Sequence, residues 1–113
     1  MVTLHKLTIT IKTTEKNLED TKWLLSLCRN LARLSGLRVL KEDFARFEGR
    51  GVTAFLILAQ SHLSIHTWPE YGLAYVDILS NKDITDEEIA SMKDCLIKSE
   101  VEIVSFKSTK EPL

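Results

Sequence analysis

The sequence predicts an α+β protein, a two-layer α/β sandwich in which a largely antiparallel sheet carries two helices on one face. Several short segments have the alternating or wholly apolar patterns of strands, whereas only two segments have helical periodicity. Adjacent strand segments are joined by short turns, which favours antiparallel neighbours. The predicted order of elements is β-α-β-β-β-α-β. We expect the second face of the sheet to be solvated or buried against a partner.

The size and composition of the chain restrict its possible functions. The 113 residues carry a net charge of −1, from 15 Lys and Arg against 16 Asp and Glu, and 44% are hydrophobic. This length predicts one domain, residues 1–113, with a real core, and the composition excludes wholesale disorder. The balanced charge gives no basis for binding nucleic acid or an acidic membrane surface. An enzyme of this size needs a compact site or one shared between subunits.

The sequence shows no targeting, membrane-spanning or disulfide pattern, and we expect a cytoplasmic protein. Its longest apolar run, residues 54–59, is too short to span a bilayer but suits a buried strand. Cys28 and Cys95 both lie in helical patterns, with a spacing that fits neither a disulfide framework nor a zinc site. We expect both to be buried, reduced thiols.

The first strand and the first helix have clear local signals. Residues 3–12 alternate between apolar and polar side chains, as a half-buried strand does. Residues 13–15, Thr-Thr-Glu, can cap a following helix, and Glu15 is favourable near the N-terminus of that helix. The apolar positions then repeat at near-helical spacing up to Gly36. Glycine can take the left-handed conformation that ends many helices, so we expect the helix to end there.

The middle of the chain predicts strands joined by turns. Residues 37–47 have a weak strand pattern, and Gly49-Arg50-Gly51 marks a tight turn. Residues 52–59 are almost wholly apolar, which predicts a central strand covered on both faces. Residues 62–66 alternate as a short strand, and residues 73–79 form the next strand pattern.

The last part of the chain predicts a helix and a strand. Thr85 and Glu88 have the Thr-x-x-Glu spacing of a capping box, which predicts a helix beginning at this point. Residues 101–106 predict a final strand. The tail, residues 108–113, has the composition of a frayed end.

One segment, residues 60–72, places polar and reactive side chains directly after the most apolar strand, where a site on a rigid element would be built. His62 and His66 have the spacing of a helical metal pair, but extended chain would separate them by about 13 Å, so we expect no metal site. No Gly-x-Ser-x-Gly elbow supports a serine hydrolase. From the residues alone, a strand with hydrogen-bonded histidines and a packed Trp68 remains the leading interpretation.

Residues 61–72, Ser-His-Leu-Ser-Ile-His-Thr-Trp-Pro-Glu-Tyr-Gly, closely resemble the signature of the small prokaryotic S-adenosylmethionine decarboxylases. These are pyruvoyl enzymes that cleave themselves at the serine opening this motif. Weaker similarities extend over most of the chain, at His5, Arg46-Phe47, residues 51–53 and Val76-Asp77. The resemblance implies a homodimer or a higher homo-oligomer with sites near the subunit interface.

The resemblance also implies a processing reaction between Gln60 and Ser61. The Ser61 hydroxyl would attack the Gln60 carbonyl and move the acyl group from nitrogen to oxygen. β-Elimination of the ester and hydrolysis of the resulting dehydroalanine would leave a pyruvoyl group at position 61. His66 and Thr53 match the family's processing residues, with Thr53 standing where serine is usual. The products would be a β chain of residues 1–60 and an α chain of residues 61–113.

The pyruvoyl group is the cofactor that the resemblance implies. It would form a Schiff base with the amine of S-adenosylmethionine and accept the electrons left when CO₂ departs. Phe47 matches an aromatic on the adenine side of the substrate, Glu70 matches an acid that binds polar substrate groups, and Trp68 is a further candidate contact. The decarboxylated product would donate aminopropyl groups for spermidine.

Besides Thr53, two family positions that matter for the chemistry differ in this sequence. Gln60 stands where glutamate is usual, but the carbonyl under attack belongs to the backbone, so cleavage remains feasible. Asn81 stands where the family has the cysteine that donates a proton to the decarboxylated carbon, and an amide is no general acid near neutral pH. Three functions therefore remain open. The first, which we favour, is S-adenosylmethionine decarboxylation; the others are a pyruvoyl-dependent arginine or ornithine decarboxylase and a non-catalytic homologue lacking the proton donor.

Overall fold

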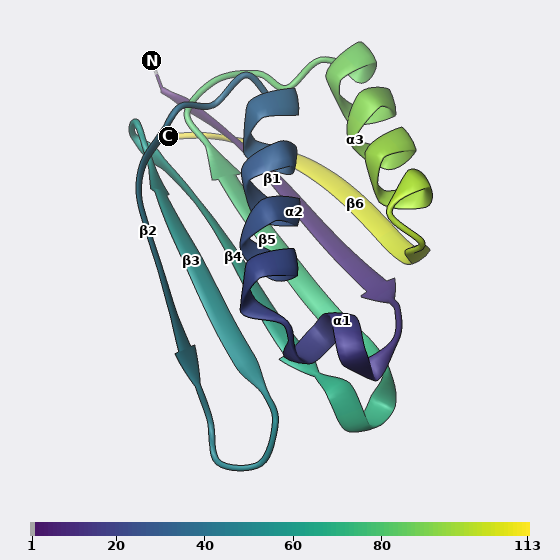
Figure 1. Ribbon diagram of the computed structural model, residues 1–113. Coiled ribbons are helices and arrows are strands. Elements are labelled where there is room, and N and C mark those ends of the chain that lie inside the picture. The colour runs from purple at the N-terminus through teal and green to yellow at the C-terminus, as the bar shows by residue number, and fades with distance from the viewer. Residues whose placement is uncertain (1) are drawn as a thin grey trace.

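A computed structural model gives the fold of residues 2–113 (Figure 1). The strands are β1 (Thr3–Lys12), β2 (Val39–Arg46), β3 (Val52–Leu58), β4 (Ser61–Trp68), β5 (Leu73–Ser80) and β6 (Glu102–Pro112). The helices are α1 (Glu15–Glu19), α2 (Thr21–Leu34), α3 (Asp86–Lys98) and the short 3-10 helix η1 (Pro69–Tyr71). The strands form one six-stranded antiparallel sheet in the spatial order β2-β3-β4-β5-β1-β6.

The predicted fold class is confirmed, because α1, α2 and α3 all cover the same face of an antiparallel sheet (Figure 1). For residues 2–113, the predicted order β-α-β-β-β-α-β was one strand and one α-helix short, and it omitted the 3-10 helix η1. The structure has all six strands that the individual segments predict, including β3 and β4, which pair on either side of a two-residue turn formed by Ala59 and Gln60. The first predicted helix divides at Asp20, whose carboxylate accepts the backbone N–H groups of Lys22 and Trp23 and so begins α2.

The helix ends follow the local signals in the sequence. The Thr14 hydroxyl accepts the N–H of Asn17 at the start of α1. At α3 the predicted capping box is present, with Glu88 N–H donating to the Thr85 hydroxyl at 3.1 Å and Thr85 N–H to the Glu88 carboxylate at 2.9 Å. Gly36, just beyond α2, has a φ of +75°, as the predicted helix end requires. Within residues 2–113, no helix is both long and apolar enough to cross a bilayer.

The core lies between the sheet and the helices. Alternate side chains of β1, β3, β4 and β5 are buried toward the helices, where the apolar side of α2 meets them. Burying each large aliphatic side chain stabilises the fold by about 1.5–3 kcal/mol. Cys28 is part of this core, and burial raises the pKa of its thiol to about 12, whereas Cys95 is half-buried. The largest fully buried side chains include Leu7, Ile9, Ile11, Leu18, Leu24, Leu31, Leu56, Leu63, Ile65 and Ile78.

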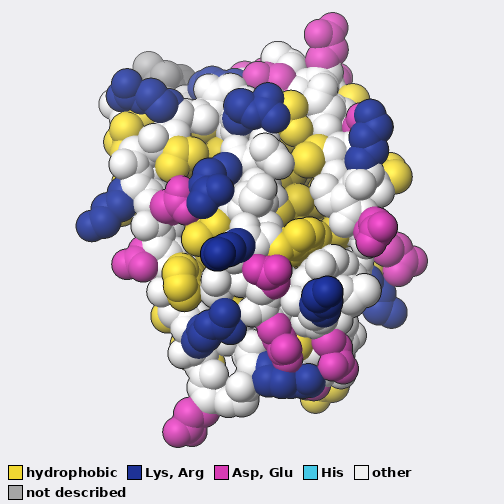
Figure 2. Space-filling view, viewed as in Figure 1, with side chains coloured by type: hydrophobic (Ala, Val, Ile, Leu, Met, Phe, Trp, Pro, Cys, Tyr) yellow, Lys and Arg dark blue, Asp and Glu magenta, His cyan; other side chains and the backbone are white. Residues whose placement is uncertain are grey.

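The second face of the sheet, which we call the open face, carries no helix among the described residues. Because the side chains of Ala54 and Leu56 point toward the helices, Phe55 and Ile57 point to the open face. Large apolar side chains are exposed there, including Phe55 at 41%, Ile57 at 46% and Tyr75 at 38%. In contrast, acidic and basic side chains are scattered over the helix-covered side (Figure 2). The open face therefore has the character of an interaction surface.

The C-terminal tail differs from its prediction. Residues 108–113 were expected to fray, but β6 continues to Pro112 and pairs with β1, where Thr3 lies opposite Pro112. Beyond the strand, Leu113 N–H donates to the Val2 carbonyl at 2.8 Å. Backbone pairing does not require apolar side chains, which is why the polar composition of this tail was a poor guide.

Candidate active site

The turn between β3 and β4 contains the peptide bond at which cleavage was predicted. Gln60 has a φ of +56°, in the left-handed region that residues with a side chain rarely adopt. Holding such a residue there costs about 1–2 kcal/mol. Since β3, which is buried on one face, fixes the chain just before this turn, the strained Gln60 and the Gln60–Ser61 peptide bond stand on a rigid support.

Three residues of this turn and of the end of β5 form one hydrogen-bonded group. The Ser61 hydroxyl donates to Asn81 Oδ1 at 3.1 Å and accepts the backbone N–H of Asn81, also at 3.1 Å. The Asn81 amide nitrogen donates to Gln60 Oε1. The structure thus brings together the predicted cleavage residues and the predicted proton-donor position. Gln60 and Asn81, two of the positions predicted to differ from the family, are therefore in direct contact.

Thr53 and His66 form a second pair. They lie opposite each other on β3 and β4, and Thr53 Oγ1 is 2.9 Å from His66 Nδ1. The contact fixes the orientation of the imidazole while its other nitrogen, Nε2, remains available to exchange a proton with a reacting group. Both side chains are half-buried. The two predicted processing residues are therefore joined by a hydrogen bond.

The predicted substrate-binding residues line a single cavity of about 320 Å³. Phe47 and Trp68 supply aromatic surface to it, and Glu70, from η1, supplies a carboxylate. Arg50 also lines this cavity, and its guanidinium contacts the Glu15 carboxylate at 3.1 Å. The sequence placed Arg50 only in a turn, because its position at the cavity depends on how the β2–β3 hairpin folds against η1. The arrangement suits a ligand that has both a ring and charged groups.

The two groups of residues lie at opposite ends of β4. Ser61 opens the strand and His66 follows five residues later, which places them about 16 Å apart along the strand. In Figure 1 the β3–β4 turn is at the top of the sheet, whereas the β2–β3 hairpin and η1 are at the bottom. The Ser61 end holds Gln60, Ser61 and Asn81; the His66 end holds Thr53, His66, Phe47, Trp68 and Glu70.

The other motif histidine, His62, directly follows Ser61 at the start of β4. Its ring stacks on Phe55 with centroids 5.5 Å apart, and its Nε2 is 3.6 Å from a carboxylate oxygen of Asp77. His62 and His66 are both in β4, so the extended interpretation of this segment is confirmed. Among residues 2–113, no three His, Cys, Asp or Glu side chains are grouped so that they could hold a metal ion.

Comparisons with known proteins identify the family that the chain is similar to. A family model described as S-adenosylmethionine decarboxylase matches residues 5–108. The S-adenosylmethionine decarboxylase proenzyme of Thermodesulfovibrio yellowstonii is 33% identical over 106 residues, which are 86% of this chain and 76% of the relative. The proenzyme of Clostridium botulinum is also 33% identical, over 88 residues that are 76% of each chain. The proenzyme of Pseudomonas aeruginosa is 33% identical over 72 residues, which are 64% of this chain and 45% of the relative. The chain thus spans less than half the length of that relative.

A solved structure supports the fold. The crystal structure of the adenosylmethionine decarboxylase from Aquifex aeolicus is similar with a TM-score of 0.72 and 24% sequence identity. The similarity covers 97% of this chain and 88% of the other. At this identity the likeness speaks to the arrangement of helices and strands alone.

Proposed function

This chain belongs to the S-adenosylmethionine decarboxylase family, and on that premise we propose that it is a self-cleaving, pyruvoyl-dependent decarboxylase of S-adenosylmethionine. Its product would supply aminopropyl groups for spermidine. Self-cleavage would divide the single domain, residues 1–113, into a β chain of residues 1–60 and an α chain of residues 61–113. The observation that carries the proposal is the Ser61 hydroxyl, held beside the strained Gln60 residue by two hydrogen bonds to Asn81.

The residues around Ser61 fit the formation of a pyruvoyl group. The Ser61 oxygen adjoins the peptide bond that it would attack, and breaking that bond would release the strain at Gln60. The Asn81 N–H, at 3.1 Å, would stabilise negative charge developing on this oxygen. When formed, the pyruvoyl ketone supplies an electron sink for decarboxylation. His66, oriented by Thr53, would exchange the protons that cleavage requires.

These roles require a second copy of the chain, because His66 lies about 16 Å along β4 from Ser61. We propose a homodimer in which the two sheets pack with their open faces together and β4 of one copy runs against β4 of the other in the opposite direction. The Ser61 end of one copy then meets the His66 end of the second. Each dimer would have two such sites, and each site would use residues from both chains.

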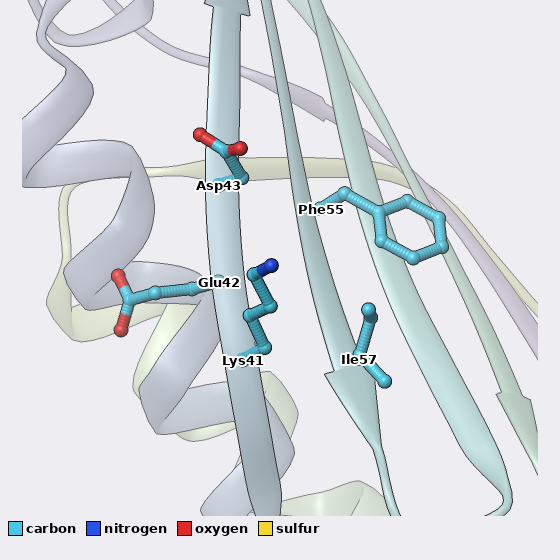
Figure 3. Close-up of a pocket in the computed structure, with 5 residues that line it drawn as sticks. All are labelled: Lys41, Glu42, Asp43, Phe55 and Ile57. Atoms are coloured by element: carbon cyan, nitrogen blue, oxygen red, sulfur yellow. The ribbon is translucent and has the colours of Figure 1, made fainter.

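The open face supports this dimer. Phe55 and Ile57 form the apolar side of a shallow depression of about 160 Å³, and Lys41 and Asp43 of β2 border it (Figure 3). Glu42 turns away toward α2, where its carboxylate accepts two hydrogen bonds from Arg29. Apolar area with a polar border is typical of a surface that a partner covers. Covering it with a second copy would also exclude water from the sites.

The cavity at the His66 end suits S-adenosylmethionine. The rings of Phe47 and Trp68 could stack on adenine, and the carboxylates of Glu48 and Glu70 could pair with the cationic part of the substrate. Arginine and ornithine would use the carboxylates but leave the aromatic surface unfilled. This difference favours S-adenosylmethionine over the other two amino acids.

The test is the intact mass of the purified protein after incubation. Two fragments separating between positions 60 and 61 are expected, whereas a Ser61→Ala variant should remain one chain. Co-expression of Ser61→Ala with His66→Ala chains then tests the shared site. The His66→Ala chain should be cleaved in the mixed dimer but not in its own homodimer, because only the mixed dimer joins an intact Ser61 to an intact His66. Cleavage of the His66→Ala homodimer would contradict a site that is shared between the two chains.

A second candidate function, a non-catalytic homologue, has one observation in its favour: Asn81 occupies the proton-donor position and is bonded to Gln60. A single unmodified mass for the natural sequence after long incubation would support it and would refute both enzyme functions. If fragments form, CO₂ release from S-adenosylmethionine, arginine and ornithine identifies the substrate. Asn81→Cys should increase that release if the missing donor limits the reaction.

A further inference from the structure

The connection between β5 and α3 carries Asn81 and ends at Ile84. It places the Asn81 backbone N–H on the Ser61 hydroxyl, a bond that does not depend on which side chain stands at position 81. At the start of this connection, the hydroxyl of Ser80, the last residue of β5, donates to the carbonyl of Lys82 at 2.8 Å. The far end of the connection is held by a residue from the other end of the chain, His5 of β1.

His5 is only 2% exposed and lies beneath this connection, with both ring nitrogens in hydrogen bonds. The backbone N–H of Ile84 donates to Nδ1 at 2.9 Å. An N–H group can only donate, so Nδ1 must be the unprotonated nitrogen of a neutral ring. The proton is then on Nε2, which donates to the Ser108 hydroxyl at 2.6 Å. The two contacts thus select the neutral imidazole that carries its proton on Nε2.

We propose that neutral His5 is a positioning residue for Ser61: by accepting the Ile84 N–H it fixes the connection whose Asn81 N–H holds the Ser61 hydroxyl. This inference rests on the proposed function, because it assigns His5 a part in self-cleavage. His5 touches neither Ser61 nor Gln60 and acts only through the backbone of residues 81–84. Protonating Nδ1 places a hydrogen against the hydrogen of Ile84 N–H and breaks that contact.

The charges near His5 come from two elements. Asp83 of the same connection lies 3.6 Å from Nδ1, and Lys110 of β6 binds the Asp83 carboxylate at 2.7 Å. Burial lowers the pKa of His5 below its usual value, Lys110 and Lys82 lower it further, and Asp83 opposes them. The balance favours the neutral ring near pH 7 and lets acid reverse it.

Two substitutions of His5 separate the two contacts. His5→Asn can place its carboxamide oxygen where Nδ1 is, so it keeps an acceptor for Ile84 N–H at every pH. His5→Gln reaches farther and can keep the Ser108 contact, but it loses the Nδ1 acceptor. At pH 7.5, His5→Gln should cleave roughly tenfold more slowly than the natural sequence, whereas His5→Asn should stay within a few-fold of it.

The pH profile of cleavage is the readout that a purely structural role would not change. The natural sequence should slow as the pH falls toward 5, from titration of His5 together with any other processing group. His5→Asn should lose the His5 part of that dependence and cleave faster than the natural sequence in acid. Equal profiles for the two proteins, or equal rates for His5→Gln and His5→Asn, would overturn the inference.

A second measurement keeps the inference separate from the proposed function. In a His66→Ala background the chain should stay uncleaved with Ser61 intact, so amide hydrogen exchange can be followed by NMR. The protection factors of Ile84 and Asn81 should fall together in acid and should stay constant with His5→Asn. If no protein cleaves but these amides respond as expected, the proposed function fails and the anchoring by His5 stands. If the two amides respond independently, the inference fails whatever the chain does.

Discussion

The two ends of β4 differ in what they contain. The Ser61 end has a strained turn and a closed set of hydrogen bonds among Gln60, Ser61 and Asn81, with no imidazole among these contacts. The His66 end has the oriented imidazole and the cavity of about 320 Å³. One end could supply the nucleophile and the other the base and the substrate pocket. The difference teaches that, under the proposed function, each end holds half of the groups that the chemistry needs.

The largest expected effect tests whether the Ser61 end depends on the His66 end. His66→Ala removes the group that would move protons during cleavage, and such groups contribute about 10²- to 10⁴-fold in rate. Cleavage followed by mass over time should slow by that factor, although Ser61 and its neighbours are unchanged. Thr53→Ser, which keeps a hydroxyl for His66 Nδ1, should cleave close to the natural rate. Normal cleavage by His66→Ala would mean that the Ser61 end is sufficient.

A slightly smaller effect tests how the two ends meet. Ile57→Lys places a charge on the open face, and losing an interface anchor weakens a dimer by about 2 kcal/mol, or roughly 30-fold. Sedimentation should show dissociation at concentrations where the natural chain is dimeric, and cleavage should slow in parallel. Ile97→Lys is the matched control, because Ile97 is 64% exposed but lies on α3, on the helix-covered side. Equal behaviour of the two variants would argue against a dimer formed by the open faces.

The sequence was informative where the signal is local. The capping box at Thr85 predicted α3, and the motif identified the residues at both ends of β4. The apolar residues 52–59 predicted β3, but the expected cover on both faces was wrong, because Phe55 and Ile57 are exposed on the open face. The break at Asp20 was missed because the apolar repeat continues through it, although its capping side chain is a local signal. The tail beyond residue 108 was mispredicted because its pairing with β1 joins opposite ends of the chain.

For the site, the sequence supplied the residues but not their contacts. Counting from the motif found Asn81, yet the direct contact between Asn81 and Gln60 depends on the pairing of β4 with β5. The same holds for Arg50, which reaches the cavity only when the hairpin is folded. The separation of Ser61 and His66, in contrast, follows from the rise per residue of a strand, so it could be calculated once this segment was predicted to be extended.

A moderate effect would sharpen the account of the Ser61 end. Gln60→Gly removes a left-handed strain of about 1–2 kcal/mol, so cleavage should slow about 5- to 30-fold if this strain drives the reaction. Glu100→Gly is the matched control, since Glu100 also has a positive φ of 63° but lies after α3, away from the site. It should relieve similar strain and leave the cleavage rate unchanged. Equal rates for both variants would show that the turn positions Ser61 without driving its attack.

The smallest expected effect concerns acid, which should weaken the contact by which His5 anchors the Ser61 end. Burial holds the pKa of His5 below the value of 6.5 that it has in an unfolded chain. The unfolded state therefore takes up the proton first, so the free energy of unfolding should fall as the pH drops below about 6.5 and level off below the folded pKa. Urea unfolding at several pH values should show this decline, and His5→Asn should show a shallower one. An identical decline in both proteins would assign the acid sensitivity to other groups, and the His5 contact would no longer distinguish the two ends.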